Sequence, residues 1–367
     1  MKVIFFSQAF TKKRSEILNQ LESLKAECEP IIALIISDEG RAKMQQRDPR
    51  VITEYLEQKK FKLDYVLTKI YEYAKFSFEC GNYDAAVQQL AIFRNLVSSD
   101  DKRAIPALWG NLAAEILRQN WDGALDNCNR LRDQIENMPR ASQALQMHFR
   151  TWLIHWSLFV YFNHRRGSEL IIELFFRQST YVIRHFVLFF FLTFFFFRFR
   201  SGREQPTTPY LDAVQTMCPH ILRYIAAAII TSDRRKDVMK SLIKVIQAEA
   251  YNYHDPVTEF IECLYVNFDF DKAQLKLRDC EQVLANDFFL CGLQELFMDN
   301  ARLLVFESFC RMHKTISIKN MAAKLNLTPD EAERWIVKLI TSDPDFQDAK
   351  IDSQNVCSKQ INLLFIS

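Results

Sequence analysis

Glycine is scarce in this chain, and the few glycines do not cluster. Only seven occur among 367 residues, and none forms a GxGxxG, GxxxxGK[ST] or GxSxG motif. The sequence therefore lacks the signatures of phosphate-cradling loops and of the nucleophile elbow. Scarce glycine also argues against a sheet-rich protein with many tight turns, whereas long stretches rich in Leu, Ala, Glu, Lys and Gln favour helices.

Paired cysteine spacing and an excess of charge are also missing. The nine cysteines contain no CxxC motif, and such usage is typical of a reducing compartment. We therefore expect a location in the cytoplasm, with or without the nucleus. In such a protein we expect the thiols to serve as small apolar side chains. The 47 basic and 45 acidic residues give a net charge of +2, so no dominant attraction to nucleic acid is expected. The first ten residues lack the long apolar core of a signal peptide.

An aromatic-Asp-x-Ala pattern occurs three times, beginning at Tyr83, Trp121 and Phe270. After each aromatic residue, apolar positions step by four, three and four, which is one face of an α-helix. The first two copies lie 38 residues apart, and an apolar helical stripe precedes each of them. The unit is therefore helix, turn, helix, with about the period of tetratricopeptide-like or HEAT-like arrays. We expect each aromatic ring to pack between helices, the alanine to permit close approach, and successive units to stack.

Two further helices are predicted in the N-terminal half. Residues 15–29 carry an apolar stripe, and Pro30 is expected to end that helix. Residues 151–162 are apolar nearly all round and include Trp152 and Trp156, so we expect a central buried helix there.

The period changes near residue 300, where a C-terminal module begins. Residues 300–314 form an amphipathic pattern, followed by a short β-branched run, a short helix, a second helix and a second possible strand at 349–352. That order is typical of a winged helix. Thr328 and Glu331 form a capping box at the second helix, with Pro329 at its first position.

Such a module can read DNA, but its second helix is acidic at its start. Asp330, Glu331 and Glu333 precede the two offsetting cations, Arg334 and Lys338. Acidic side chains there suit the helix dipole but repel phosphate. With Trp335 on the buried stripe, this helix is predicted to contact protein, in preference to a nucleic-acid-reading role.

A helical array that ends in a winged helix resembles the PCI-domain scaffold proteins, which are shared by the proteasome lid, the signalosome and translation initiation factor 3. Within that group the chain is most similar to the E-subunit family of eukaryotic translation initiation factor 3, over about residues 13–353. The segments that carry the resemblance are YAKFSFECGNYDAA (73–86), RTWLIHWSLFVYFNH (150–164), QTMCPHILRY (215–224), DPVTEFIECLYVNFDFDKAQ (255–274) and LTPDEAERWIV (327–337).

The resemblance implies a mainly α fold: a right-handed helical-repeat (TPR/HEAT-like) array followed by a C-terminal winged helix (PCI domain). It also implies a non-catalytic scaffold that assembles with other initiation factor 3 subunits through PCI–PCI contacts. Within the complex such a scaffold contacts the 40S ribosomal subunit. Its contact with mRNA or rRNA is expected to be indirect or weak. We expect a helical-repeat region at 13–178 and a PCI domain at 210–353, with its helical part at 210–298 and the winged helix at 299–353. Under this hypothesis the structural or interface candidates are Tyr83, Trp121, Phe270, Trp152, Trp156, Arg334, Trp335 and Lys338.

Three segments depart from the family pattern: 1–12, 179–209 and 354–367. The middle one contains HFVLFFFLTFFFFRFR, and phenylalanine codons are pyrimidine-rich, as is the tract before a splice acceptor. We interpret these segments as translated intron sequence, which arises either from a misplaced exon boundary or from a true retained-intron isoform. A disordered insertion is the other interpretation of 179–209. Loss of family sequence after residue 353 predicts a truncated wing that lacks its last strand, and hence weakened docking.

Other interpretations stay open. A PCI subunit of a proteasome-lid or signalosome-type complex fits the same architecture, and a nucleic-acid-binding winged helix is a third class. A membrane-associated adaptor would use the phenylalanine run, but the run from 186 to 197 is twelve residues long, whereas a spanning helix needs about twenty. No membrane contact is expected.

Few residues suggest catalysis or metal binding. His155 lies on an apolar helix and is predicted to be a hydrogen-bonded core residue. Cys218 and His220 lack a second pair at zinc spacing. Asp269 and Asp271 flank an aromatic turn residue, where helix N-capping by Asp271 explains them more simply than acid–base chemistry. The basic run at 234–236 is expected to be a solvated loop, with RNA contact as the alternative. No enzyme activity, cofactor or metal is predicted.

Overall fold

The computed structural model describes residues 2–45, 49–98, 101–138, 142–176, 208–232, 235–313, 315–342, 349–352 and 360–363. Its contacts divide the chain into two units, Met1–His164 and Arg165–Ser367. The phenylalanine run and Arg234 lie outside the described residues. The expected loop at 234–236 is wrong for Arg235 and Lys236, which begin the helix Arg235–Glu249. The expected helical array with a terminal winged helix is confirmed.

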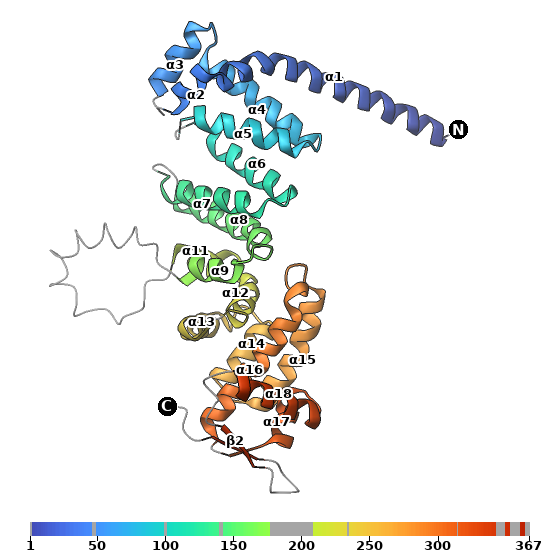
Figure 1. Ribbon diagram of the computed structural model, residues 1–367, viewed down its shortest axis with the longest axis vertical. Helices are drawn as coiled ribbons and strands as arrows, with labels where there is room; N and C mark the ends of the chain where they lie inside the picture. The colour runs from blue at the N-terminus through green and yellow to red at the C-terminus, as the bar shows by residue number, and fades with distance from the viewer. Residues whose placement is uncertain are drawn as a thin grey trace, which may run out of the picture. The chain divides into compact units, whose positions relative to one another are not determined.

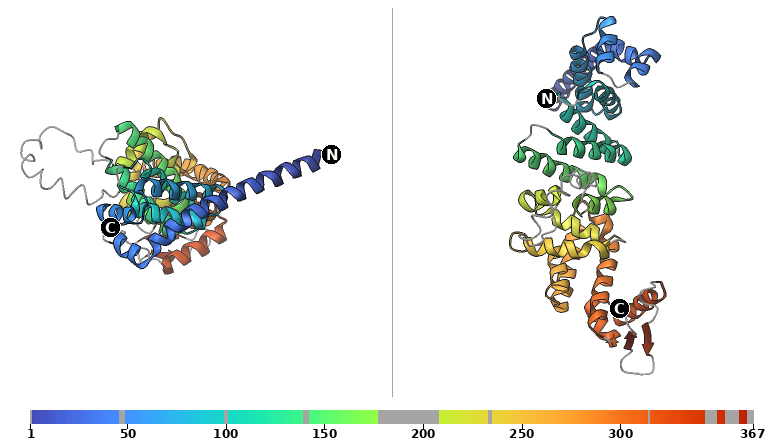
Figure 2. Two further views of the ribbon diagram at one scale, coloured as in Figure 1. Left: turned by 90° about the horizontal axis from the view of Figure 1, so that it is seen from above. Right: turned by 90° about the vertical axis from the view of Figure 1, so that its left-hand side faces the viewer.

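The first unit is entirely helical in its described part, and its helices contact one another in chain order (Figures 1 and 2). The helices are α1 (Lys2–Ile36), α2 (Asp38–Gln45), α3 (Pro49–Gln58), α4 (Leu63–Glu79), α5 (Tyr83–Leu96), α6 (Ala104–Leu117), α7 (Trp121–Glu136) and α8 (Gln143–Tyr161). One core cluster lies among α1, α3, α4, α5 and α6 and includes Ile31, Leu56, Ile70 and Phe93, all without solvent exposure.

The prediction that a helix would end at Pro30 is wrong. Helix α1 continues through Pro30 to Ile36 and also begins well before residue 15. Proline inside a helix removes one backbone hydrogen bond and costs about 3 kcal/mol. Burial of Ile31 and Ile35 in the core beyond it supplies a compensating gain, because fully burying one such side chain contributes roughly 1.5–3 kcal/mol.

The turns of the three predicted repeats share one backbone conformation. The residue before each N-cap has a positive φ: 83° at Gly81, 58° at Gln119 and 52° at Phe268. In the first two turns the next N–H reaches back to a carbonyl of the preceding helix, from Asn82 to Ser77 and from Asn120 to Glu115. This is the Schellman ending of a helix, which reverses the chain within a few residues.

The N-caps of the three repeat helices lie one residue before the aromatic. Asn82, Asn120 and Asp269 each accept a hydrogen bond from a backbone N–H three residues later. The prediction that Asp271 is an N-cap is therefore wrong by two positions. Asp271 lies in the first helical turn, where its charge still interacts favourably with the helix dipole.

The second unit begins with two helices that flank residues 177–207. The Thr208 hydroxyl donates to the Phe175 carbonyl at 2.8 Å and accepts from the Leu211 N–H, so the two helix ends meet. Thr208 caps the second of these helices and Pro209 is its first residue, so this helix begins just before the expected boundary at 210. The helices of this part are α9 (Gly167–Phe176), α11 (Pro209–Met217), α12 (Ile221–Ile230), α13 (Arg235–Glu249), α14 (Pro256–Tyr265), α15 (Phe270–Asn286), the short 3-10 helix η1 (Cys291–Leu293) and α16 (Gln294–Met312).

The winged helix follows α16 with the predicted order of elements. They are β1 (Thr315–Ser317), α17 (Ile318–Leu325), α18 (Pro329–Ser342), β2 (Ala349–Asp352) and β3 (Gln360–Leu363). The capping box is confirmed: the Thr328 N–H donates to Glu331 Oε2 at 3.0 Å, and the Glu331 N–H donates to Thr328 Oγ1 at 3.4 Å.

The expectation of a truncated wing is wrong, because the sheet contains a third strand. β3 lies between β1 and β2 and pairs antiparallel with both, with Ile361 opposite Ile316 and Ile351. The strand falls inside the tail that we expected to lie outside the family. Its sequence Gln-Ile-Asn-Leu alternates polar and apolar residues, which is the strand period. The premise for weakened docking is therefore removed.

Candidate assembly surfaces

The aromatic residues of the repeat turns are buried or half-buried. The Tyr83 ring meets Phe78 of the preceding helix edge-on, with ring centroids 5.4 Å apart. Phe270 meets Phe309 of α16 at 5.2 Å, and Trp121 is half-buried. The alanine three residues after each aromatic is fully buried, at Ala86, Ala124 and Ala273. Tyr83 thus contacts the helix before its own turn, whereas Phe270 contacts a later helix outside its own pair.

Each repeat aspartate contacts a basic side chain at or just beyond the end of a later helix. Asp84 accepts from Arg118 Nε at 2.6 Å, and Asp122 lies 3.2 Å from His164 Nε2. Asp271 pairs with Lys324 of α17. The carboxylates are largely exposed, so each pair contributes at most about 1 kcal/mol to stability. Their common effect is to link each repeat to a later one and to tie the winged helix to α15.

Helix α8 exposes an aromatic face. Trp152 is 51% exposed and meets Trp109 of α6 edge-on at 6.3 Å, while the His148 ring lies 6.0 Å from Trp152. Trp156 is half-buried and contacts Phe159. The expected central buried helix is therefore wrong for this face. The other face is buried and includes Leu153, Ile154, Ser157 and Leu158, but apolar composition alone does not reveal which sides a repeat neighbour covers.

The second winged-helix helix divides into an inner and an outer side. Trp335 is half-buried and meets Phe306 of α16 at 5.9 Å, whereas Arg334 and Lys338 are exposed. Arg334 Nε donates back to the Asp330 carbonyl at 3.2 Å. Hydrogen bonds from the Thr328 hydroxyl and N–H lower the pKa of Glu331. The exposed start of this helix thus stays anionic, which disfavours phosphate.

A turn residue fixes the winged helix against the helical part of its unit. Asn326 has a φ of 56°, and its Oδ1 accepts hydrogen bonds from Gln274 Nε2 at 2.8 Å and Arg278 Nε at 2.9 Å. Its Nδ2 donates to the Gln274 carbonyl at 3.2 Å. An open polar groove of about 830 Å³ runs beside this contact, between α15 and the turn. Sequence patterns did not indicate this anchor, because its partners are 48 and 52 residues away.

An ionic network lies at the centre of the second unit. Arg223 Nε donates to Asp255 Oδ1 at 2.7 Å, and Arg223 Nη1 donates to Asp287 Oδ2 at 3.3 Å. The Tyr224 hydroxyl also donates to Asp287 Oδ2, at 3.0 Å, and Asp255 caps α14 through the Val257 N–H. Both carboxylates are buried. The network therefore joins α12, the start of α14 and the segment after α15.

The network also shifts the pKa values of its members. Burial opposes the charge of Arg223, but the hydrogen bond and charge of Asp255 outweigh it, so the pKa of the guanidinium is raised. Burial raises the pKa of Tyr224 to about 12, and the charge of Asp287 adds to the effect. Tyr224 therefore remains a neutral donor at physiological pH.

The residues considered for catalysis or metal binding are hydrogen-bonded, buried or at a helix end. His155 Nδ1 lies 2.7 Å from the Thr151 carbonyl of its own helix, so the predicted hydrogen bond is confirmed, although the ring is half-buried. Cys218 is buried, and the neighbouring His220 precedes the first turn of α12. No cluster of three metal-type ligands occurs among the described residues. None of the helices in the described ranges is long and apolar enough to cross a membrane.

Six of the described cysteines are buried, in agreement with the expected role as small apolar side chains. Burial raises the pKa of Cys28 and Cys218 to about 11 and that of Cys128 and Cys310 to about 12.

Two segments of the chain match the sequence models of known protein families. Residues 277–357 match the sequence model of the PCI domain, and residues 5–77 match that of the eIF3 subunit 6 N terminal domain. The second match begins inside the segment 1–12 that we expected to lie outside the family, and the first ends four residues beyond the expected boundary at 353.

Several relatives match nearly the whole chain, and each is the E subunit of eukaryotic translation initiation factor 3. That of Bombyx mori is 44% identical over 352 residues, which cover 94% of this chain and 72% of the relative. Those of Culex quinquefasciatus and Drosophila melanogaster are 43% and 42% identical, with 95% of this chain and 72% of each relative covered. The chain belongs to the E-subunit family of eukaryotic translation initiation factor 3.

Proposed function

We propose that this chain is a non-catalytic scaffold subunit of the eukaryotic translation initiation factor 3 complex. In that role it supports formation of the 43S pre-initiation complex and recruitment of mRNA to the 40S ribosome. The observation that carries the proposal is the match to the family over 94% of the chain, together with the winged helix at the end of the array. The working compartment is the cytoplasm.

The partners are other subunits of the factor, bound through PCI–PCI contacts at the wing. In the three-stranded sheet, β3 is central and β2 is an edge strand. An edge strand presents backbone N–H and C=O groups that a strand from another chain can pair with. Contact with the 40S subunit is made within the assembled complex, and contact with mRNA or rRNA is weak or indirect. The exposed anionic start of α18 and the net charge of +2 support that assignment.

Proline substitutions in the edge strand test this assembly mode. In an antiparallel strand, successive residues direct their N–H groups to opposite sides. Of Lys350→Pro and Ile351→Pro, one therefore removes an N–H from the free edge and the other removes one that faces β3. We expect fewer sister subunits to co-purify with either tagged variant than with the unchanged tagged chain.

The matched controls are Lys350→Ala and Ile351→Ala, which keep the backbone N–H groups and should retain normal amounts of sister subunits. Normal stoichiometry in both proline variants would refute docking at this edge. Loss of binding in the alanine variants would instead assign the contact to side chains.

A further inference from the structure

In the described part of the first unit, one half-buried cation has no salt bridge to a carboxylate. Arg94 of α5 is half-buried, and among the described residues its guanidinium has no ion pair. Burial and the like charge of Arg130 both lower the pKa of Arg94, which means that its surroundings disfavour the charge. Arginine in proteins remains protonated regardless, so the site keeps a positive charge, which the charge of Asp126 offsets only in part.

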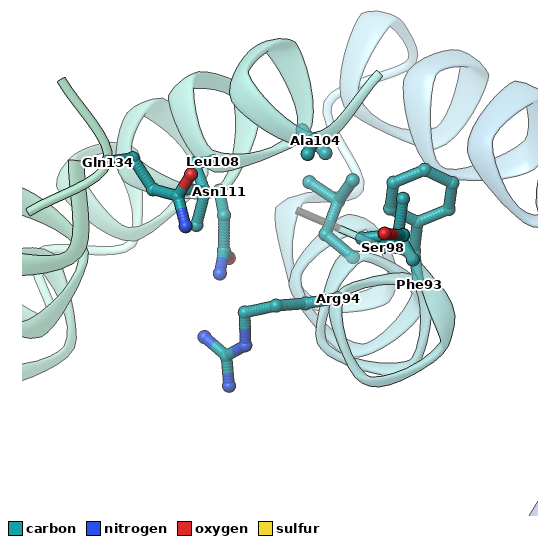
Figure 3. A pocket seen from close by; sticks show the side chains of 10 residues that line it. Phe93, Arg94, Ser98, Ala104, Leu108, Asn111 and Gln134 are labelled. Atoms are coloured by element: carbon teal, nitrogen blue, oxygen red, sulfur yellow. The ribbon is translucent and has the colours of Figure 1, made fainter. Parts of the chain in front are cut away.

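Arg94 lies where two hollows meet. One is a cavity of about 190 Å³ between α5, α6 and α7, whose lining includes Phe93, Leu108, Asn111 and Gln134 (Figure 3). In Figure 3 the polar ends of Arg94, Asn111 and Gln134 lie along one side of this cavity, with Leu108 beside the last two, and Phe93 lies on the other side. The volume corresponds to roughly six water molecules at about 30 Å³ each, which is room for one large apolar side chain.

The second hollow is an open groove of about 950 Å³ that shares Arg94, Val97 and Ser98 with the cavity. Its apolar lining comes from α1, α3, α4 and α5 and includes Ile35, Ile52, Leu67 and Leu96. We call the two hollows together the Arg94 groove. The named apolar side chains are themselves buried, so they form a limited apolar floor at the base of the groove.

The charged side chains that line the Arg94 groove are positive in excess. Four arginines and two aspartates line the open part, so two positive charges remain. Both aspartates, Asp64 and Asp101, are already bound by Arg103 at 2.9 Å and 2.8 Å. Arg130 pairs with Asp126 on its own helix. The cations left for a ligand are Arg94 and the exposed Arg41.

These observations favour a peptide over a nucleic acid. The ring of Phe93 is fully buried, so it offers no stacking face for a base, and the apolar lining is aliphatic elsewhere. A carboxylate can accept two parallel hydrogen bonds from one guanidinium. We propose that the Arg94 groove binds an acidic peptide segment of a partner protein, with a large apolar side chain in the cavity and a flanking carboxylate on Arg94. This proposal stands independently of assembly through the wing.

Fluorescence anisotropy with the full chain tests the proposal. The probe is a fluorescein-labelled peptide with a Leu-Phe pair flanked on each side by two glutamates. Matched peptides replace the glutamates by lysines, or the Leu-Phe pair by two serines. We expect saturable binding of the first peptide alone, with affinity reduced at least about tenfold by Arg94→Met. The control Arg166→Met, at an exposed pair in the other unit, should leave the affinity unchanged.

A second variant keeps the test decisive if Arg94→Met folds poorly. Ala104 lines the cavity and is buried, so Ala104→Leu fills the space without a change of charge. Ala104→Leu should lower the affinity for the acidic Leu-Phe peptide as strongly as Arg94→Met does. The proposal is overturned if the lysine peptide binds equally well, if neither variant weakens binding, if no peptide saturates, or if single-stranded RNA of similar length binds more tightly than the acidic peptide.

Discussion

Arg223 holds together the centre of the second unit, and its removal should loosen several helices at once. Arg223→Met keeps the aliphatic stem but deletes the charge, and leaves the buried Asp255 and Asp287 carboxylates without their shared cation. The substitution therefore combines the loss of hydrogen bonds with repulsion between two carboxylates in a poorly solvated site.

The expected magnitude follows from the exposure of the three partners. Breaking a buried ion pair by removal of one partner costs about 3–5 kcal/mol. The carboxylate side chains are 1% and 6% exposed, but the Arg223 side chain is 29% exposed, so solvent screens part of the interaction. We therefore expect a loss of about 3 kcal/mol, at the lower end of that range.

Hydrogen–deuterium exchange of amides in α12 and α14 measures this loss locally, which matters because the chain has two units. A loss of about 3 kcal/mol corresponds to exchange that is roughly 100-fold faster in these helices. The double variant Arg223→Met/Asp287→Asn should recover part of the protection, because it removes one unpaired charge. The control is Arg166→Met, whose pair with Glu169 is exposed. An effect of Arg223→Met no larger than that of the control would refute the reasoning.

Three further predictions follow from single features. Gln119→Gly should stabilise the first unit by roughly 1 kcal/mol in thermal unfolding, because φ is 58° at Gln119 and glycine adopts that conformation without strain; a destabilised variant would contradict this. Alkylation of the native chain at pH 8 should label the exposed Cys80 and Cys291 before the six buried cysteines, because the buried thiols have raised pKa values or little contact with solvent. Rapid labelling of those six in the native chain would contradict their burial. Deletion of residues 179–207 should raise the soluble yield with helicity retained, because it removes a low-charge phenylalanine run and keeps the Thr208 cap; loss of cooperative unfolding would show that the segment is needed.

The helices and their grouping were predictable because apolar periodicity is a local property of the sequence. The stripes after Tyr83, Trp121 and Phe270 correspond to three repeat helices, and the capping box at Thr328 was found from four adjacent residues. The continuation of α1 through Pro30 was missed because the compensating contacts lie in other helices.

The surfaces were harder to predict because they depend on distant partners. The Arg223 network joins residues 32 and 64 positions apart, and Asn326 is fixed by residues about 50 positions earlier. The left-handed turns at Gln119 and Phe268 lack the glycine that usually signals them. The N-cap of the repeat helices was misplaced by two positions, since an Asn or Asp one residue before the aromatic takes that role.

The central claim is that this chain works as a subunit of eukaryotic translation initiation factor 3. The most direct test is purification through an affinity tag on the chain, followed by quantitative mass spectrometry and sedimentation of the eluted complex. The account predicts near-equimolar subunits of that factor, with part of the material sedimenting with 40S particles. Recovery of proteasome-lid or signalosome subunits in their place, or of the chain alone in a membrane fraction, would contradict it.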